Sequence, residues 1–185
     1  DGPLFVKANQ ESLAHGTTVE QCFEFMARAS AHFPFRVLMM GYYNTAFKMG
    51  HEVFVRRLAQ AGAVGFILPD LPVEEAGELH ALAASVDLAP IVLMTPTSTD
   101  ARLQTLGAAA HGFVYVVARK GVTGGSTAMN EDVTRLLDRC RAATDLPLAL
   151  GFGVATREDV AFIAEHADIA IIGTAALRAW ENGGE

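Results

Sequence analysis

One pattern repeats along this chain: a short apolar run followed by an amphipathic stretch. A short run rich in aliphatic and aromatic residues indicates a buried strand, and a longer stretch with apolar residues at helical spacing indicates a helix. We expect strands at 36–43, 64–70, 89–95, 112–118, 146–153 and 169–175. We expect helices at about 17–31, 51–62, 74–85, 99–108, 129–143 and 156–166. Ser98–Thr99–Asp100, Asn130 and Thr156 can each cap the helix that follows. This alternation is typical of βα units that form a parallel sheet.

Serial βα units can form either an open doubly wound sheet or a (β/α)8 barrel. No Gly-x-Gly-x-x-Gly motif follows the first run, which weakens the dinucleotide-binding alternative. Glycine and polar residues instead gather after the last three strands, where barrel enzymes build phosphate sites. Six strands cannot close an eight-stranded barrel, and residues 1–10 (DGPLFVKANQ) begin abruptly in a loop-like stretch. Either the sheet is open or the sequence lacks part of a barrel, and the abrupt start favours the second.

Composition excludes several classes of protein. Hydrophobic residues make up 51% of the chain and charged residues 19%, which favours a folded protein over a disordered one. The net charge is −7 and no basic cluster is present, so we expect no nucleic-acid binding. No apolar run approaches the length of about 20 residues that spans a membrane, and residues 1–10 do not resemble a signal peptide. Cys22 and Cys140 are predicted to be free thiols in a cytoplasmic protein, and the spacing of the six histidines predicts no metal site.

Three glycine-bearing loops follow the last three predicted strands. They contain Gly121–Gly124, Gly151–Gly153 and Gly173–Thr174, and the last precedes a short helical stretch, AALRAW. Glycine lets backbone N–H groups approach a phosphate, and a helix N-terminus adds partial positive charge. One such loop is ordinary for a βα connection. Three in succession at one end of a barrel predict a phosphate site, to which Thr174 adds a hydroxyl donor.

Two other predicted strand ends carry polar or aromatic side chains. Asp70, in LPDLPVEE (68–75), is either a catalytic or partner-contacting carboxylate or an acidic residue in a helix-entry turn, and taken alone the second reading is favoured. Tyr42, Tyr43 and Asn44 either line a flat apolar pocket or pack at the rim, and the sequence favours neither. Asp1 is the carboxylate of the first loop.

These motifs, in this order and spacing, resemble the tryptophan synthase alpha-subunit family over essentially the whole chain. The resemblance is carried by DGP (1–3), GYYN (41–44), LPDLPVEE (68–75), PTS (96–98), GFVYVVARKGVTG (112–124), GFGV (151–154) and IIGTA (171–175). It implies a single domain over residues 1–185, an incomplete (β/α)8 barrel that covers strands 3 to 8. It also implies a carbon–carbon lyase of tryptophan biosynthesis. The reaction is the retro-aldol cleavage of indole-3-glycerol phosphate to indole and glyceraldehyde 3-phosphate.

The resemblance also implies roles for individual residues. Asp1 matches the family's catalytic Asp, which contacts the indole N–H. The family's partner Glu, at the end of the second strand, has no counterpart here, so we expect the chain as given to be inactive. Tyr115 matches a substrate-side tyrosine, and Thr123 matches the threonine that binds the catalytic Asp. The expected phosphate cradle is Gly124, Gly153, Gly173 and Thr174, and the expected indole pocket is Tyr42, Ile67 and Leu93.

The stretch ARKGVTGG (118–125) resembles the family's lid over the active site. Gly121 and Thr123 belong to this lid, Arg119 is expected to hold its closed form, and Lys120 is expected to be solvated. The resemblance further implies a pyridoxal phosphate-dependent beta subunit as partner, in an assembly of two alpha and two beta subunits. The alpha chain itself is expected to need no cofactor. The DGP loop, the LPDLP region and the lid are expected to face the beta subunit.

Two alternatives stay open at this point. The first is a non-catalytic barrel that lacks the catalytic Glu and binds phosphate or regulates a beta subunit. The second is another phosphate-binding barrel enzyme of histidine or tryptophan biosynthesis, against which GVTG (121–124) and LPDLP (68–72) argue.

Overall fold

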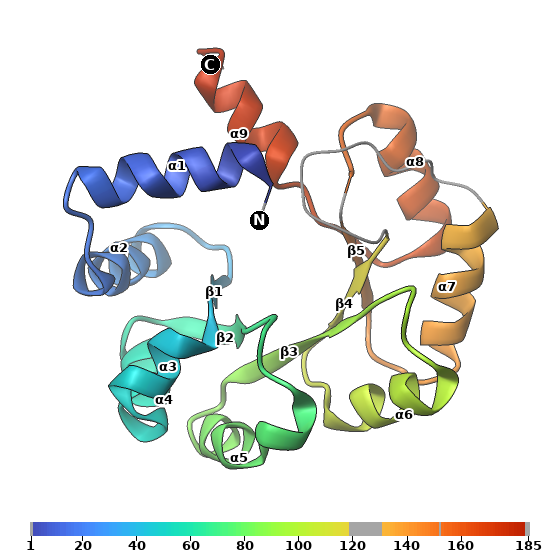
Figure 1. Ribbon diagram of the computed structural model, residues 1–185, viewed down its shortest axis with the longest axis horizontal. Helices are drawn as coiled ribbons and strands as arrows, with labels where there is room; N and C mark the ends of the chain where they lie inside the picture. The colour runs from blue at the N-terminus through green and yellow to red at the C-terminus, as the bar shows by residue number, and fades with distance from the viewer. Residues whose placement is uncertain (1, 119–130, 152, 184–185) are drawn as a thin grey trace. The chain divides into compact units, whose positions relative to one another are not determined.

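The computed structural model describes residues 2–118, 131–151 and 153–183. In these residues each strand is followed by one or two helices, as the repeated apolar runs predict (Figure 1). The chain divides into two compact units. Unit 1 contains residues 1–15, 93–108 and 113–185, and unit 2 contains residues 16–92 and 109–112. The prediction of a single domain stays a prediction.

Unit 2 consists of βα units with parallel strand pairing. Its elements are α2 (Val19–His32), β1 (Val37–Met40), α3 (Tyr43–Met49), α4 (His51–Gln60), β2 (Ala63–Ile67), the 3-10 turn η1 (Val73–Glu75), α5 (Gly77–Ser85) and the first residues of β3 (Ala89–Met94). β1 pairs with β2, and β2 pairs with β3. Gly65 allows the second pairing, because a Cβ there would meet the backbone carbonyl of Ala89.

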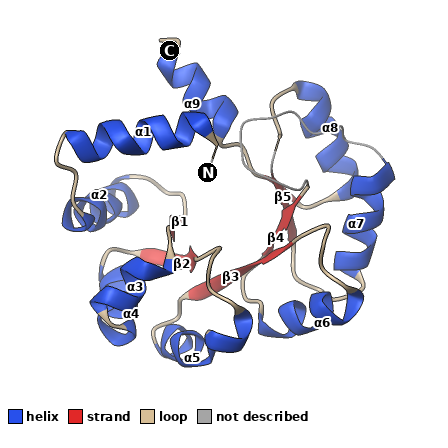
Figure 2. Ribbon diagram, viewed as in Figure 1, coloured by secondary structure: helices blue, strands red, loops and turns tan. Residues whose placement is uncertain are grey.

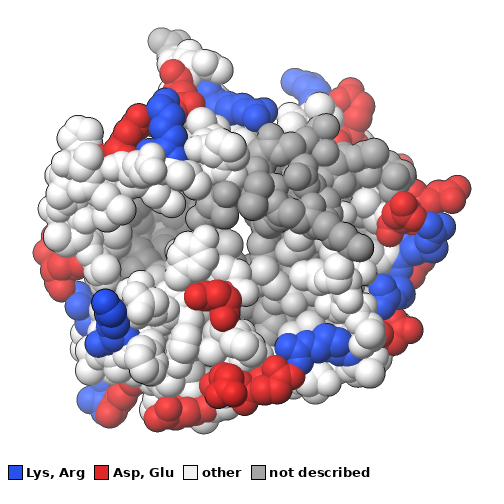
Figure 3. Space-filling view, viewed as in Figure 1, with Lys and Arg blue, Asp and Glu red and all other residues white. Residues whose placement is uncertain are grey.

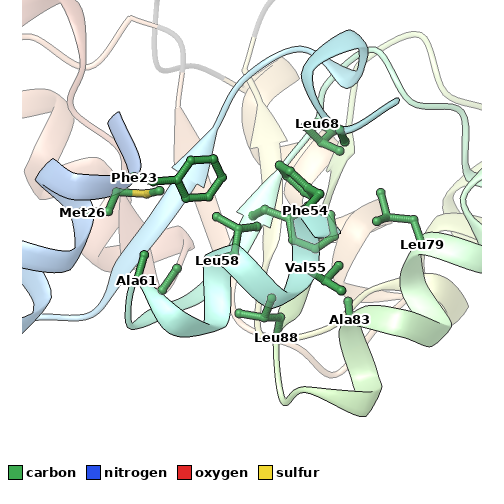
Figure 4. Packing of buried hydrophobic residues seen from close by; sticks show 13 residues of the cluster. Phe23, Met26, Phe54, Val55, Leu58, Ala61, Leu68, Leu79, Ala83 and Leu88 are labelled. Carbon is green, nitrogen blue, oxygen red and sulfur yellow. The ribbon is translucent and has the colours of Figure 1, made fainter. Parts of the chain in front are cut away.

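The core of unit 2 is a cluster of apolar side chains between helices α2, α4 and α5 and strand β2 (Figure 4). Phe54 of α4 is fully buried, and its ring meets the ring of Phe66 edge to face at 5.6 Å between centroids. Val55 and Leu58 continue the buried face of α4, one and four residues after Phe54. This spacing puts all three on the helix face that turns toward the sheet. Burial of that face holds α4 against β2.

Unit 1 repeats the same architecture (Figure 2). Its elements are α1 (Pro3–Ala14), the end of β3, most of α6 (Asp100–Ala109), β4 (Val114–Val117), α7 (Glu131–Arg141), β5 (Leu148–Gly151), α8 (Arg157–His166), β6 (Ile169–Ala170) and α9 (Thr174–Glu181). β4 and β5 pair in parallel, as do β5 and β6. Every residue of β4 and β5 is buried, which explains why both strands read as continuous apolar runs.

One carboxylate joins three elements of unit 1. Asp168 Oδ2, just before β6, accepts hydrogen bonds from the Leu148 N–H at the start of β5 and from Arg141 at the end of α7, both at 2.7 Å. The hydrogen bond from the Leu148 N–H has the largest effect on the pKa of the Asp168 carboxyl, followed by the bond from Arg141. Together they hold this pKa below its usual value. Nearby on α7, burial raises the pKa of the Cys140 thiol to about 11. Cys140 is therefore an inert core residue, whereas Cys22 is exposed.

Helix starts were predicted with mixed success. Thr156 does cap α8, and it forms a capping box with Asp159. Asn130, a second expected cap, lies outside the described residues. The expectation of a loop at residues 1–10 is wrong, because α1 begins at Pro3. Pro at the first helical position and the helix-forming residues that follow favour this helix, which buries no side chain and so shows no apolar periodicity.

The predicted strand over residues 36–43 is too long. β1 ends at Met40, and Tyr43 is already the first residue of α3. Tyr42 is the N-cap of that helix, so the two adjacent tyrosines have different backbone conformations. The β-forming preference of two tyrosines masked the helix start at this position.

Candidate functional site

The glycines predicted to form a phosphate cradle follow neighbouring strands of unit 1. Tyr115 of β4 is paired in register with Ala149 of β5, and Leu150 with Ala170 of β6. Because these strands are parallel, their carboxyl ends meet at one edge of the sheet. Gly151, Gly153 and Gly173 come at or just after those ends. The structure thus brings two of the predicted cradle glycines, Gly153 and Gly173, to a common edge within one unit.

Tyr115 packs directly against Gly151. A Cβ built on Gly151 would lie 2.6 Å from the phenolic oxygen of Tyr115 and 2.9 Å from its Cζ, both shorter than a normal contact. The Tyr115 side chain is buried, and this burial raises its pKa, so the phenol stays protonated near neutral pH. Gly151 is therefore required to be small, because it makes the space that the tyrosine ring occupies.

We predict that Gly151→Ala lowers the free energy of unfolding by about 1–3 kcal/mol, the usual cost of overpacking a core. The backbone of Gly151 is not in the left-handed region, so the cost is steric and comes from the Tyr115 ring. Urea denaturation of Gly151→Ala, Tyr115→Leu and the double mutant measures the free energy of unfolding. The decrease in this free energy caused by Gly151→Ala should be smaller in the Tyr115→Leu background. Equal losses in both backgrounds would show that the ring is not the obstacle.

Two helix N-termini of unit 1 differ in how they are capped. At α8, Asp159 Oδ2 accepts the N–H groups of Ala155 at 2.9 Å and Thr156 at 2.8 Å. Burial alone would raise the pKa of Asp159, but these hydrogen bonds lower it on balance, so the carboxylate is charged. The positive end of α8 is thus already neutralised by its own side chain. At α9, the N-cap is Gly173, and no side chain caps the helix.

The space around Gly173 and Gly153 suits a ligand that approaches the backbone. Gly173 is exposed, and a Cβ there would make only an ordinary contact, 3.5 Å from the Phe5 ring of α1. Gly153 has a φ of +114°, a conformation that side-chain-bearing residues rarely adopt. Thr174, the first residue of α9, is partly exposed. These positions can present backbone N–H groups and one hydroxyl to an anion.

The predicted indole-contacting residues are divided between the units. Ile67 is the buried last residue of β2, and Tyr42 is half exposed, both in unit 2. Leu93 is a partly buried residue of β3 that belongs to unit 1. Ile67 is the last residue of β2 and Leu93 the last but one of β3, so both lie near the carboxyl ends of their strands.

Asp70 has a structural role that the local sequence does not reveal. Its Oδ1 accepts a hydrogen bond from the Tyr43 N–H at 2.8 Å, so it caps α3 rather than the helix that follows it in the chain. Tyr43 Oη in turn lies 2.9 Å from His51 Nε2, and His51 Nδ1 lies 2.8 Å from Glu78 Oε2. His51 and Glu78 were not among the predicted site residues. Their spacing along the chain carries no motif.

Five of the predicted positions lie outside the described residues: Asp1, Arg119, Gly121, Thr123 and Gly124. Their assigned roles stay predictions.

Two other kinds of feature are absent from the parts of the chain that the structure describes. No group of three or more His, Cys, Asp or Glu side chains there is arranged to hold a metal ion. Within the same residues no helix is both long and apolar enough to cross a membrane. On the face seen in Figure 3, Lys and Arg side chains lie beside Asp and Glu. Among the ion pairs of the described residues, Arg139 Nε lies 2.7 Å from Asp100 Oδ1.

Comparison with known proteins decides the family. A family model described as tryptophan synthase alpha chain matches residues 1–185. The chain belongs to the tryptophan synthase alpha-chain family. It is 47% identical over 184 residues to the tryptophan synthase alpha chain of Syntrophotalea carbinolica, an alignment that covers 100% of this chain and 73% of that relative.

Solved structures of this family share the fold. A tryptophan synthase from Mycobacterium tuberculosis matches with a TM-score of 0.90 and 34% identity, over 98% of this chain and 69% of that one. The tryptophan synthase a2b2 complex from the hyperthermophile Pyrococcus furiosus matches with a TM-score of 0.90 and 28% identity, over 100% of this chain and 75% of that one. The predicted (β/α)8-barrel class is therefore confirmed, and the open doubly wound sheet is excluded.

Membership of the tryptophan synthase alpha-chain family also settles the reaction class. The protein is a carbon–carbon lyase of tryptophan biosynthesis, and its reaction is the cleavage of indole-3-glycerol phosphate. The matches favour neither a non-catalytic barrel nor a phosphate-binding barrel enzyme of another pathway step.

Proposed function

We propose that the phosphate of indole-3-glycerol phosphate binds at the N-terminus of α9, on Gly173 and Thr174, with Gly153 beside them and Gly124 of the lid completing the cradle. The observation that carries this proposal is the contrast between the two helix N-termini. Asp159 already occupies the positive end of α8, whereas the N-cap of α9 is a glycine with no capping side chain. A dianionic phosphate would supply the missing acceptor there.

The indole ring of the substrate is proposed to contact Tyr42, Ile67 and Leu93, and Tyr115 is proposed to lie near the substrate. Ile67 and Tyr115 are each buried, so each can offer apolar surface to a flat ring. The protonated phenol of Tyr115 is a polar group that carries no charge. These contacts would bind and orient the ring rather than transfer protons.

The proton transfers are proposed to involve Asp1 as one of two carboxylates. Cleavage requires a proton on the indole ring carbon that leaves, and loss of a proton from the glycerol hydroxyl that becomes the aldehyde. As the ring carbon gains its proton, positive charge develops on the indole nitrogen, where the Asp1 carboxylate would accept the N–H and stabilise the charge. Thr123 would orient Asp1 by a hydrogen bond. Arg119 and Gly121 would serve closure of the lid, which excludes water.

The partner is proposed to be a tryptophan synthase beta subunit. The support is the likeness to the alpha chains of tryptophan synthase complexes, among them one whose description is an a2b2 assembly. We propose the same stoichiometry here, with pyridoxal phosphate held by the beta subunit and no cofactor in this chain. A cytoplasmic location is proposed from the two unpaired cysteines.

We test the phosphate site with Thr174→Val, which keeps the shape of the side chain but removes the hydroxyl. Calorimetric titration with glycerol 3-phosphate, the phosphate-bearing part of the substrate, should give a dissociation constant about tenfold higher than that of the wild type. This is the change expected when one hydrogen bond to a charged group is lost. Thr105→Val, on an exposed face of α6, is the matched control and should bind as the wild type does. Equal affinities of Thr174→Val and the control would overturn the α9 assignment.

A further inference from the structure

A chain of hydrogen bonds in unit 2 holds both ends of one tyrosine. At the backbone end, the Tyr43 N–H donates to Asp70 Oδ1 at 2.8 Å. At the side-chain end, Tyr43 Oη lies 2.9 Å from His51 Nε2. His51 Nδ1 is in turn 2.8 Å from Glu78 Oε2. This network of hydrogen bonds thus links the loop after β2, the first residue of α3, the first residue of α4 and the first turn of α5.

Chemistry fixes the direction of each bond when His51 is neutral. The carboxylate of Glu78 can only accept, so the proton of the imidazole sits on Nδ1. Nε2 is then an acceptor, and the hydroxyl of Tyr43 must donate to it. The carboxylate of Asp70 accepts from the N–H of Tyr43 and places negative charge at the positive end of α3. Every group in the hydrogen-bond network therefore has a defined donor or acceptor role.

Helix α3 also has apolar packing apart from the network. Ala46 of α3 is completely buried, and the rings of Tyr43 and Phe47 are 5.9 Å apart. The hydrogen bonds set the position of its first residue. Tyr42 directly precedes that residue, is the N-cap of α3, and does not cap it with its side chain. A shift of Tyr43 would move the backbone of Tyr42 with it.

We propose that Asp70, His51 and Glu78 are positioning residues for the substrate's indole ring, because they hold Tyr43 and through it set the place of Tyr42. The proposal rests on the proposed contact between Tyr42 and the ring. None of the three residues touches the substrate in this proposal. Their effect is on binding geometry.

Steady-state kinetics of the alpha chain, expressed from its own gene and assayed with the beta subunit, tests the proposal. His51→Phe and Tyr43→Phe each remove the same hydrogen bond, and each should raise KM for indole-3-glycerol phosphate about fivefold with kcat nearly unchanged. The double variant should be no worse than either single one. A merely structural defect would lower the fraction of folded enzyme, and with it the apparent kcat, but would leave KM as it is.

Asp70 has a conservative replacement that separates capping from charge. Asp70→Asn keeps the Oδ1 acceptor and should retain a KM near that of the wild type, whereas Asp70→Ala should raise KM. Amide hydrogen exchange at Tyr43 should quicken in Asp70→Ala and not in Asp70→Asn. Asp145→Ala, an exposed aspartate of unit 1, is the matched control and should change neither KM nor exchange.

Tyr42→Ala distinguishes failure of this proposal from failure of the proposed function. If Tyr42→Ala raises KM while the His51, Tyr43 and Asp70→Ala variants keep the KM of the wild type, the positioning proposal is overturned and the ring contact stands. If Tyr42→Ala leaves KM unchanged, the ring contact itself is wrong and the positioning proposal falls with it.

Discussion

Gly173→Asp should raise KM for indole-3-glycerol phosphate by about 100-fold or more and leave the protein folded. The new carboxylate would stand at the N-cap of α9, where it would occupy the acceptor position proposed for the phosphate. Bringing two like charges together costs several kcal/mol, and a 100-fold change needs only about 2.7 kcal/mol. The change is measured by steady-state kinetics with the beta subunit present.

The fold should tolerate this substitution. A Cβ on Gly173 makes only an ordinary contact, with the Phe5 ring, and Asp is a favoured N-cap residue. The melting temperature should therefore stay the same or rise slightly. Gly77→Asp is a matched control, since Gly77 begins α5 and has open space around it. A KM for Gly173→Asp within about threefold of the control would mean that the phosphate does not bind at α9.

Phe54→Ala should lower the free energy of unfolding by about 3–5 kcal/mol. Phe54 is completely buried in the core of unit 2, and truncation would leave a cavity against the Phe66 ring. For a protein of ordinary stability this loss is a large share of the total. Urea denaturation followed by circular dichroism measures the change.

The matched control for Phe54→Ala is Phe25→Ala. Phe25 lies on α2 with 64% of its surface exposed, so its truncation should cost less than about 0.5 kcal/mol. Similar losses for the two variants would show that the cluster around Phe54 is not the stabilising core of this unit. A loss for Phe54→Ala alone would support it.

The sequence by itself determined the βα architecture and the family. Apolar runs mark strands because buried parallel strands need apolar side chains on both faces, and β4 and β5 are buried throughout, as that rule requires. Thr156 could be recognised as a cap because a capping box depends on residues three apart. Gly153, after β5, and Gly173, before α9, could also be recognised, because each lies in a short motif of neighbouring residues.

Only the tertiary structure decided which of those local signals act together. Asp70 caps α3, 27 residues before it, and not the helix that follows it, because the loop after β2 lies beside the loop after β1. The packing of Tyr115 on Gly151 depends on the register of β4 with β5, which places Gly151 opposite Val117. Helix α1 was not predicted, because it buries no side chain in the described structure and so shows no apolar periodicity. Periodicity and caps are set by neighbours along the chain, whereas contacts across strands depend on how distant segments pack, and no short motif encodes that packing.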